Sequence, residues 1–380
     1  ASIAPASPAR SIAPELDASL GWLNAAPLTL AGLRGHPVVL LFWNAGSAHC
    51  HNALQTVGAL ASRFRDSAGF VAVHVPKFDS ERDGAAALDT MRLEGVALPL
   101  ANDGDWAAWQ HYTLSAWPTA VLVDPQGVIR ERFVGDRAIE GLSAALEAEI
   151  DANFLHSPGV VDVPRLEAPA PRGALNSPGG LIVNATRLYV ADTGNHRILE
   201  CTHDGRVLRR IGTGTRDFVD GLADVSGFNA PRGMALLQDR LYVADTGNHA
   251  IRRINTRTGE VDTLVGSGRS GEPVAGVFRM PKDAALDRPW ALAVADSTLL
   301  VTLAGAHQLW AIELGAGLLR HVSGSGRFGS DEGGAEDATF AQPSALAVVG
   351  DRAYVLDAAS SSLRELRLGE VDVVMPIPDT

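Results

Sequence analysis

Apolar and polar residues alternate with different periods in the two halves of the chain. In residues 34–154, apolar runs of strand length alternate with amphipathic stretches of helix length, which is typical of a sheet flanked by helices. A turn signal at 124–127, Asp-Pro-Gln-Gly, indicates that the last two strands form an antiparallel hairpin. This half is therefore predicted to be an α/β domain with a mixed sheet. We expect strands at 38–44, 70–77, 119–124 and 128–133, and helices at 51–64, 82–93, 105–112 and 138–153.

The second half is a repeat. Prolines at 178, 231, 289 and 343 lie 53, 58 and 54 residues apart, and each begins a similar run of apolar residues. The stretch LYVADTGNH occurs at 188–196 and again at 241–249. Each unit holds about four short strand-like runs separated by Gly, Asp and Asn turns, which is the composition of a propeller blade. Four blades are predicted, at about 174–214, 228–268, 286–326 and 340–376.

Two further segments lie outside these domains. Residues 1–33 are predicted to be a leader and the approach to the first domain. Residues 155–173 contain four prolines, which cannot continue a helix or an interior strand, so this segment is predicted to be a linker. Within it, residues 160–163 are β-prone enough to be a strand lent to a neighbouring sheet.

Composition and charge narrow the classes of function. The sequence is 46% hydrophobic and 20% charged, as in globular proteins, and no apolar run approaches the roughly 18 residues that span a bilayer. The net charge is −12, and residues 174–380 alone carry 20 basic and 25 acidic residues, a balance of −5. We therefore expect neither a membrane nor a nucleic-acid partner. Two cysteines without an obvious bridge favour a reducing cytoplasm, and an exported, processed form stays open.

The repeat half resembles a known family. Its unit P-x-G-x-A followed by L-Y-V-A-D-T-G-N-H-x-I is similar to the NHL repeat of β-propellers. The resemblance implies blades around a central axis, with loops available for binding on two faces. NHL propellers commonly have six blades, so four units imply either a four-bladed ring or a shortened form whose open edges need a partner.

The first half resembles the thioredoxin fold. Val38–Cys50 reads VVLLFWNAGSAHC, and Ala116-Trp117-Pro118-Thr119 matches the cis-proline loop of that family. The order of both halves resembles proteins that join a thioredoxin domain to NHL repeats. Aligned on Phe42-Trp43 and Cys50, the first cysteine of the C-x-x-C motif is replaced by Ser47. Dithiol exchange needs two thiols, so the resemblance implies a thioredoxin-like domain with a disabled redox centre.

Three interpretations of Cys50 remain open. Cys50 is a structural residue at a degenerate site, or a thiol that acts in an oxidoreductase, or the reactive cysteine of a one-cysteine peroxidase, because peroxiredoxin-type enzymes carry Thr or Ser three residues before theirs. Trp43 stands where that family has proline, which disfavours the peroxidase. His49 and His51 flank Cys50 and are interpreted as exposed turn residues.

A binding role survives the loss of redox chemistry. In the thioredoxin fold the cis-proline loop presents backbone groups to an extended peptide, so Trp117, Pro118 and Thr119 are predicted to line a non-covalent peptide site beside Ser47. We therefore expect a binding or scaffold protein with a protein or peptide partner and no cofactor. The oligomeric state is left open, with a partner at the propeller edge as one alternative.

Three histidines occupy equivalent positions in successive repeats. His196, His249 and His307 are weak candidates for a metal site on a propeller axis. The same positions are also turn residues of the repeat, which explains their recurrence without any ligand. The structural interpretation is therefore preferred, and no metal is expected. Asp192, Asp245 and Asp357 are expected to cap backbone amides in the same turns.

Overall fold

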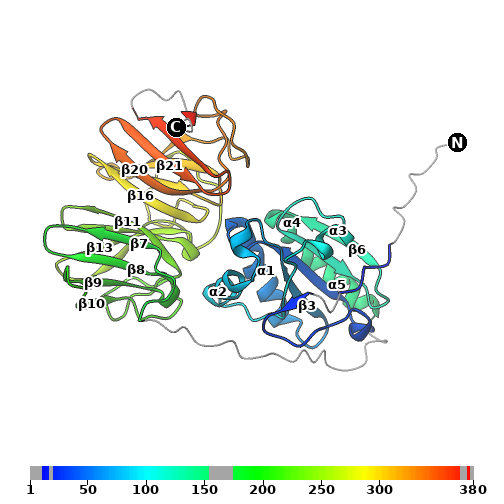
Figure 1. Ribbon diagram of the computed structural model, residues 1–380. Helices are drawn as coiled ribbons and strands as arrows, with labels where there is room; N and C mark the ends of the chain where they lie inside the picture. Colours follow the sequence, from blue (N-terminus) through cyan, green and yellow to red (C-terminus); the bar gives the residue numbers. More distant parts are fainter. Residues whose placement is uncertain (1–10, 17–19, 154–173, 369–374, 377–380) are drawn as a thin grey trace. The chain divides into compact units, whose positions relative to one another are not determined.

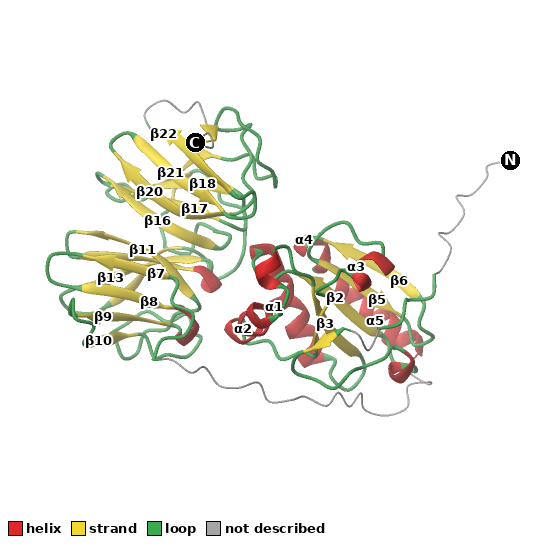
Figure 2. Ribbon diagram, in the orientation of Figure 1, coloured by secondary structure: helices red, strands yellow, loops and turns green. Residues whose placement is uncertain are grey.

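The computed structural model describes residues 11–16, 20–153, 174–368 and 375–376, and it divides into two compact units, Ala1–Ala170 and Pro171–Thr380. The first unit holds both helices and strands, whereas the regular structure of the second is almost entirely strands (Figure 2). Residues 1–10 and 17–19 of the predicted leader and approach segment lie outside the described residues. The whole of the predicted linker at 155–173, with the predicted strand at 160–163, lies outside them as well.

The first unit is built on one six-stranded mixed sheet (Figure 1). The strand order is β1-β4-β3-β2-β5-β6, in which β2, β3 and β4 are parallel and the other neighbours are antiparallel. Its strands are β1 (Gly21–Trp22), β2 (Val38–Trp43), β3 (Gly69–His74), β4 (Leu100–Asn102), β5 (Thr119–Val123) and β6 (Ile129–Val134). Its helices are α1 (Ala48–Arg63), α2 (Ala85–Leu93), α3 (Ala107–His111), α4 (Asp136–Ile139) and α5 (Leu142–Asn153), with short 3-10 turns η1 (Ala31–Leu33) and η2 (Asp79–Glu81).

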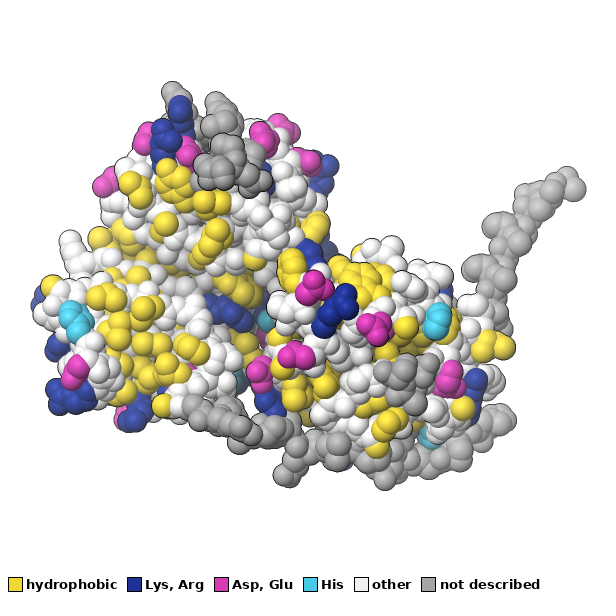
Figure 3. Space-filling model, in the orientation of Figure 1, with side chains coloured by type: hydrophobic (Ala, Val, Ile, Leu, Met, Phe, Trp, Pro, Cys, Tyr) yellow, Lys and Arg dark blue, Asp and Glu magenta, His cyan; other side chains and the backbone are white. Residues whose placement is uncertain are grey.

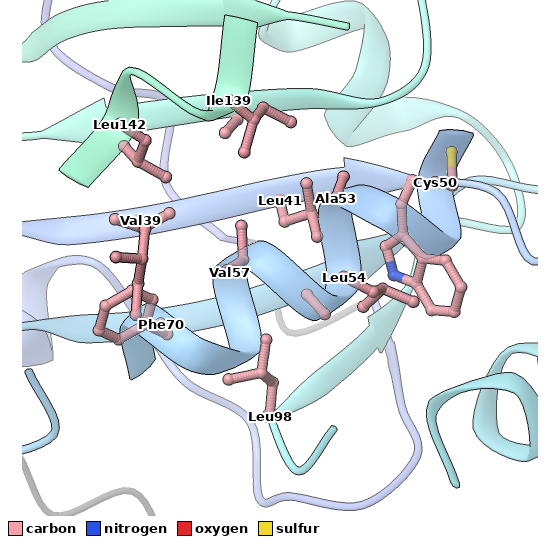
Figure 4. Packing of buried hydrophobic residues seen from close by; sticks show 14 of the residues in the cluster. Val39, Leu41, Cys50, Ala53, Leu54, Val57, Phe70, Leu98, Ile139 and Leu142 are labelled. Carbon is pink, nitrogen blue, oxygen red and sulfur yellow. The ribbon is translucent and has the colours of Figure 1, made fainter. Parts of the chain in front are cut away.

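Hydrophobic clusters cover both faces of this sheet, because alternate residues of the central strand point in opposite directions. Val39 and Leu41 of β2 pack with Leu54 and Val57 of α1 and with residues of α4 and α5 (Figure 4). Val38, Leu40 and Phe42 face the other way and pack against α3 and the N-terminal segment. Strand β2 is buried along its whole length, as the continuous apolar run at 38–43 predicts.

The α/β pattern is confirmed, with local corrections. Helix α1 begins at Ala48, three residues earlier than predicted, so Cys50 lies inside its first turn. The predicted helix at 138–153 is divided into α4 and α5, with a break at Glu140 and Gly141. The short edge strands β1 and β4 were not predicted, since two or three residues give too little alternation to recognise.

The second unit is a β-propeller-like array of four antiparallel sheets, called blades 1 to 4. The inner strand of each blade contacts that of the next, in the order β7, β11, β16, β20. Blade 3 contains a fifth strand, β15, beyond the four expected. The blades are β7–β10 (Gly180–Val183, Leu188–Asp192, Arg197–Cys201, Val207–Ile211), β11–β14 (Pro231–Leu237, Arg240–Asp245, Ala250–Asn255, Val261–Val265), β15–β19 (Gly276–Val277, Pro289–Ala295, Thr298–Leu303, Gln308–Glu313, Leu318–Ser323) and β20–β23 (Pro343–Val349, Arg352–Asp357, Ser362–Arg367, Met375–Pro376).

Candidate functional site

Ser47 and Cys50 lie together where the chain passes from β2 into α1. Ser47 is the N-cap residue, with an extended backbone (φ −93°, ψ 123°), and its carbonyl accepts the amide of His51 at 3.2 Å. Its hydroxyl does not cap a backbone amide of the helix; it hydrogen-bonds the Cys50 thiol instead. The side chains of Ser47 and Cys50, three residues apart in the sequence, are therefore in contact at the start of α1.

The thiol of Cys50 is completely buried. Burial raises its pKa to about 12, an effect that hydrogen bonds from the Asn44 amide and the Ser47 hydroxyl reduce without cancelling. The negative charges of Asp136 and Glu81 raise the pKa further. The thiol is therefore almost entirely protonated at neutral pH, and the thiolate is the form that attacks disulfides and peroxides.

Asn44 fixes the loop between β2 and the helix. Its amide nitrogen Nδ2 donates to the Val75 carbonyl at 3.1 Å and to the Glu81 carboxylate at 2.8 Å. Its Oδ1 accepts the Gly46 amide at 3.0 Å. Glu81 also accepts the Lys77 amide at 2.7 Å, so the loop is tied to the segment that follows β3. The hydrophobic pattern of the sequence did not indicate the contacts of Asn44 with Val75 and Glu81, which join residues more than 30 positions apart.

The interpretation of the two flanking histidines as exposed turn residues is wrong. His49 is half-buried, and its Nδ1 lies 2.8 Å from the carboxylate of Asp136. Burial raises the pKa of Asp136, but the hydrogen bond and charge of His49 and the hydrogen bond from Asn52 outweigh it, so the pKa is below its usual value. Both histidines lie inside helix α1, whose early start had not been predicted.

His51 forms a buried polar pair with Glu94, at the end of α2. Its Nδ1 lies 2.7 Å from Glu94 Oε1, and its Nε2 lies 2.8 Å from the Ala45 carbonyl. A carbonyl only accepts, so Nε2 carries a proton, and the contact with Glu94 requires a second proton on the ring or on the carboxyl. Gln55 donates to the other Glu94 oxygen at 2.6 Å. The pair links α1 to the end of α2. Both ring nitrogens of His51 contact these partners and not the Cys50 thiol.

The predicted peptide-binding loop lies at the same end of the sheet. Thr119 pairs with Phe42 across β5 and β2, which brings the cis peptide bond Trp117–Pro118 beside the loop that carries Ser47. The Pro118 carbonyl accepts the Gly135 amide at 2.8 Å, and the Thr119 hydroxyl donates to Ala116 at 2.7 Å. Within the described residues, neither the amide nor the carbonyl of Trp117 has a hydrogen-bond partner.

Three tryptophan rings form a cluster at this loop. The ring centroid of Trp117 lies 4.9 Å from that of Trp109 and 5.4 Å from that of Trp106. Trp109 is buried, whereas Trp106 and Trp117 are partly exposed. The i, i+3 spacing of Trp106 and Trp109 is the sequence signal for this cluster, and sequence reasoning did not use it. An aromatic surface thus adjoins the unpaired backbone of Trp117.

The histidines of the repeat join neighbouring blades. Nδ1 of His196 in blade 1 accepts the amide of Ala230 in blade 2 at 3.0 Å, and Nδ1 of His249 accepts the amide of Arg288 in blade 3 at 3.2 Å. His307 packs edge-on against Phe328, with ring centroids 5.6 Å apart. Within the part of the chain that the structure describes, no three His, Cys, Asp or Glu side chains are grouped closely enough to hold a metal.

The turns that carry these histidines share one backbone geometry. His196, His249 and His307 all have a positive φ, between 49° and 57°, at the end of the turn. The preceding aspartates accept amides from the start of their own blade: Asp192 from Asn176 at 2.8 Å and Asp245 from Asn229 at 2.7 Å. The expectation that these aspartates cap amides of their own turns is therefore wrong for Asp192 and Asp245, because their carboxylates accept amides from the segment before the first strand of the blade.

Comparison with known proteins agrees with this division of the chain. The thioredoxin-like family model matches residues 35–129, and the NHL repeat model matches residues 228–254. The chain therefore joins a thioredoxin-like domain to an NHL-repeat β-propeller-like unit. Its homologues are NHL repeat-containing protein 2 and SUPPRESSOR OF QUENCHING 1.

These similarities extend over most of this chain. It is 32% identical over 375 residues to Protein SUPPRESSOR OF QUENCHING 1, chloroplastic, of Arabidopsis thaliana, which covers 93% of this chain and 35% of that protein. It is 30% identical over 394 residues to NHL repeat-containing protein 2 of Bos taurus, which covers 94% of this chain and 54% of that protein. The matched region spans about half the length of NHL repeat-containing protein 2 and about a third of the length of SUPPRESSOR OF QUENCHING 1.

A solved structure is similar to part of this chain. The putative thiol:disulfide interchange protein DsbE of Chlorobium tepidum is 20% identical, with a TM-score of 0.32, and the match covers 38% of this chain and 96% of that one. Among the described helices of this protein, none combines the length and apolar character that crossing a membrane requires.

Proposed function

We propose that this chain is a binding or scaffold protein whose thioredoxin-like domain has lost dithiol exchange. The observation that carries the proposal is the replacement of the attacking thiol by Ser47, together with the complete burial of Cys50. An alcohol forms no disulfide, and a buried thiol with a raised pKa is a poor nucleophile. The NHL unit supplies further recognition surface, and the partner is a protein or a peptide.

The loop at Trp117 is the proposed contact for an extended peptide. Its amide and carbonyl lack partners within the described chain, and a peptide strand added at this edge would satisfy both. Trp106 and Trp117 offer apolar surface to a side chain of that peptide. Ser47 bounds the same site, where its small side chain leaves room. A nucleic-acid partner is not proposed, because the net charge of the chain is −12.

Redox chemistry is tested with peroxide and with a disulfide substrate. Intact protein is titrated with hydrogen peroxide and analysed by mass spectrometry, and insulin reduction is followed in the presence of dithiothreitol. We expect no rapid sulfenic acid on Cys50 and no thiol-dependent reduction above background. Rapid Cys50 oxidation, or a reductase activity that disappears in Cys50→Ala, would establish the alternative function, a thiol oxidoreductase or one-cysteine peroxidase.

Peptide binding has its own test. Peptides are selected from a random display library on the folded chain, and hydrogen exchange is measured with and without a selected peptide. Binding at the proposed site should slow exchange of the Trp117 amide, which has no partner in the described chain. Selected peptides that protect only other amides, or a selection that yields no peptide, count against the proposal.

A reducing compartment fits both cysteines, which are buried and unbridged. We therefore propose the cytoplasm for this chain. The name of the Arabidopsis relative gives the chloroplast for that protein. Imaging of the tagged natural protein in its own cells separates the two compartments, and a purely organellar signal would contradict the proposal.

A further inference from the structure

One edge of the sheet in the first unit collects the segments that carry the proposed peptide site. Strands β2, β3 and β4 are parallel, and β6 runs in the same direction as β2 because β5 is antiparallel to both. The segments that follow these four strands therefore lie at one edge, where β5 begins. Ser47 follows β2, Trp106 follows β4, and Trp117 precedes β5. Residues that are remote in sequence can thus contact one peptide at this edge, which is called the site edge.

Two partly exposed tryptophan rings at the site edge stand almost at right angles. The ring planes of Trp106 and Trp117 meet at 79°, with 5.4 Å between the ring centroids. Trp109 is buried and packs against both rings, which holds them in place. Trp106 and Trp117 together are called the aromatic corner. The face of an indole ring carries negative electrostatic potential, so a corner of this kind attracts a cation.

The backbone fixes Trp106 in a conformation that few large residues adopt. Its φ is 64° and its ψ is 19°, in the left-handed region. The carboxylate of Asp103 accepts the amides of Ala108 at 3.1 Å and Trp109 at 2.8 Å, and the Asp103 carbonyl accepts the amide of Trp106 at 3.1 Å. Hydrogen bonds within the chain therefore hold the corner, and such pre-organisation lowers the entropic cost of binding a ligand.

Acidic residues outnumber basic ones at the site edge. The described segments 44–47, 75–84, 103–106, 112–118 and 135–141 contain seven acidic residues, Asp79, Glu81, Asp83, Asp103, Asp105, Asp136 and Glu140, and three basic residues, Lys77, Arg82 and Arg137. The whole first unit carries 19 acidic and 11 basic residues. On its surface, acidic side chains adjoin apolar ones (Figure 3). A cationic ligand is therefore attracted to this edge, and an anionic one is repelled.

Asp105 brings one of these charges next to the aromatic corner. It directly precedes Trp106, and its side chain is 95% exposed. The guanidinium of Arg82 lies 3.9 Å from the Asp105 carboxylate and 3.0 Å from that of Asp79, so Arg82 is divided between two acidic partners. Most of the Asp105 carboxylate surface therefore remains open to a cation of a ligand.

The carboxylates at the site edge also act on the groups buried below it. Burial is the largest cause of the raised pKa of Cys50, and the charges of Asp136 and Glu81 raise it further. Burial lowers the pKa of His74, and the charges of Glu81 and Asp83 oppose this effect. Both shifts are those that negative potential produces, because it favours protonated groups. The acidic character of the edge thus extends into the domain.

We propose that the peptide bound at the site edge carries a lysine or an arginine, whose cationic group lies against the aromatic corner and pairs with Asp105. This inference rests on the proposed function and names the class of peptide that the same site selects. The amide and carbonyl of Trp117, which have no partner in the described chain, hold the peptide backbone. An acidic side chain in the corner would be repelled, so charge distinguishes one peptide from another.

Matched synthetic peptides test the role of the positive charge. A peptide selected on the full chain is compared with two versions in which its basic residue is replaced by norleucine or by glutamate. Norleucine keeps the aliphatic stem of lysine and removes the cation. We expect the affinity to fall about tenfold with norleucine and further with glutamate, and the basic peptide alone to bind more weakly as salt is added. Equal affinities of the basic and norleucine peptides would overturn the proposal.

Variants of the chain locate the contact. Trp106→Leu removes one aromatic wall and Asp105→Asn removes the exposed charge, so each should weaken the basic peptide about three- to tenfold and affect the norleucine peptide less. Phe64→Leu, at the far end of α1, and Asp151→Asn, near the end of α5, are the matched controls and should bind like the wild type. Losses in the controls as large as those at the site would contradict the assignment. Circular dichroism checks folding, and the exposed Asp105→Asn decides the matter if Trp106→Leu unfolds.

The selection of peptides separates this inference from the proposed function. Recurrence of lysine or arginine among the peptides that slow exchange of the Trp117 amide supports both. Selected peptides that protect this amide but share no basic residue would support the peptide site and overturn the preference for positive charge. A selection without any peptide that protects the Trp117 amide would overturn both.

Discussion

The backbone amide of Asn44 donates a hydrogen bond of 3.2 Å to the buried sulfur of Cys50. The sulfur also receives the Ser47 hydroxyl, so its contacts come from the loop that would carry the reactive cysteine of a working dithiol centre. In such a centre, this sulfur would release the mixed disulfide. Here it anchors the loop to the first turn of α1. The sulfur is therefore part of the packing between the loop and the helix.

Restoring a second thiol is the direct test of this relationship. Ser47→Cys places a sulfur where the hydroxyl already contacts Cys50, so we expect an intramolecular disulfide under mild oxidation and a gain in insulin reduction. Mass spectrometry detects the disulfide, and turbidity follows the insulin reaction. Ser62→Cys, on the exposed face of the same helix, is the control and should give neither. A folded Ser47→Cys protein without a disulfide would show that the site geometry no longer supports exchange.

The buried pair of His51 and Glu94 should contribute strongly to stability. Glu94→Ala leaves the His51 ring and Gln55 without their buried partner, and removing one member of such a pair costs about 3–5 kcal/mol. Glu94→Gln retains a side chain that can hydrogen-bond a neutral imidazole, so its cost should be clearly smaller. Urea denaturation measures both. Equal losses for the two variants would contradict the importance of the hydrogen bond.

The thioredoxin-like domain should lose stability as the pH falls below 6.5, in part because of His74. Burial lowers the pKa of His74 from its ordinary value of 6.5, an effect that exceeds the opposing hydrogen bond with Asn102. Between the lowered pKa and 6.5, the unfolded chain binds more protons than the folded one. The free energy of unfolding therefore rises with pH through this window and is lost as pH falls.

Denaturation of the wild type and His74→Gln between pH 5 and 8 measures this contribution, in steps of about half a unit. The variant should lose part of the slope below pH 6.5. His111→Gln, at an exposed position, is the matched control and should keep the slope of the wild type. Parallel curves for the wild type and His74→Gln would assign the slope to other groups.

His249 should stabilise the joint between blades 2 and 3 without binding metal. His249→Ala leaves the buried Arg288 amide without its acceptor and puts alanine at φ 50°, and together these effects cost about 2–4 kcal/mol. His249→Asn should cost less, because asparagine tolerates this backbone conformation and offers an oxygen acceptor. Thermal unfolding reports both variants. A melting temperature of the wild type that rises with added zinc and falls with EDTA would favour the metal interpretation.

Most of the architecture follows from the sequence pattern. The buried run at 38–43 and the alternation around it predict the central strand, and the proline spacing predicts the blades. What the pattern did not predict is short or divided: β1, β4, β15 and the break between α4 and α5. Strands of two or three residues form because neighbouring strands supply their hydrogen bonds. Such strands are too short to show an alternation of apolar and polar residues in the sequence.

The candidate site divides in the same way. The sequence by itself determined that a serine, Ser47, precedes Cys50 by three residues, because the identity of each side chain is fixed by the sequence. Only the tertiary structure decided the burial of Cys50, the pairing of His51 with Glu94 and the open backbone of Trp117. Each of these depends on groups that are remote in sequence, as with His51 and Glu94, which are 43 residues apart. Solvent exclusion and hydrogen-bond partners are properties of the folded chain, so local pattern carries no signal for them.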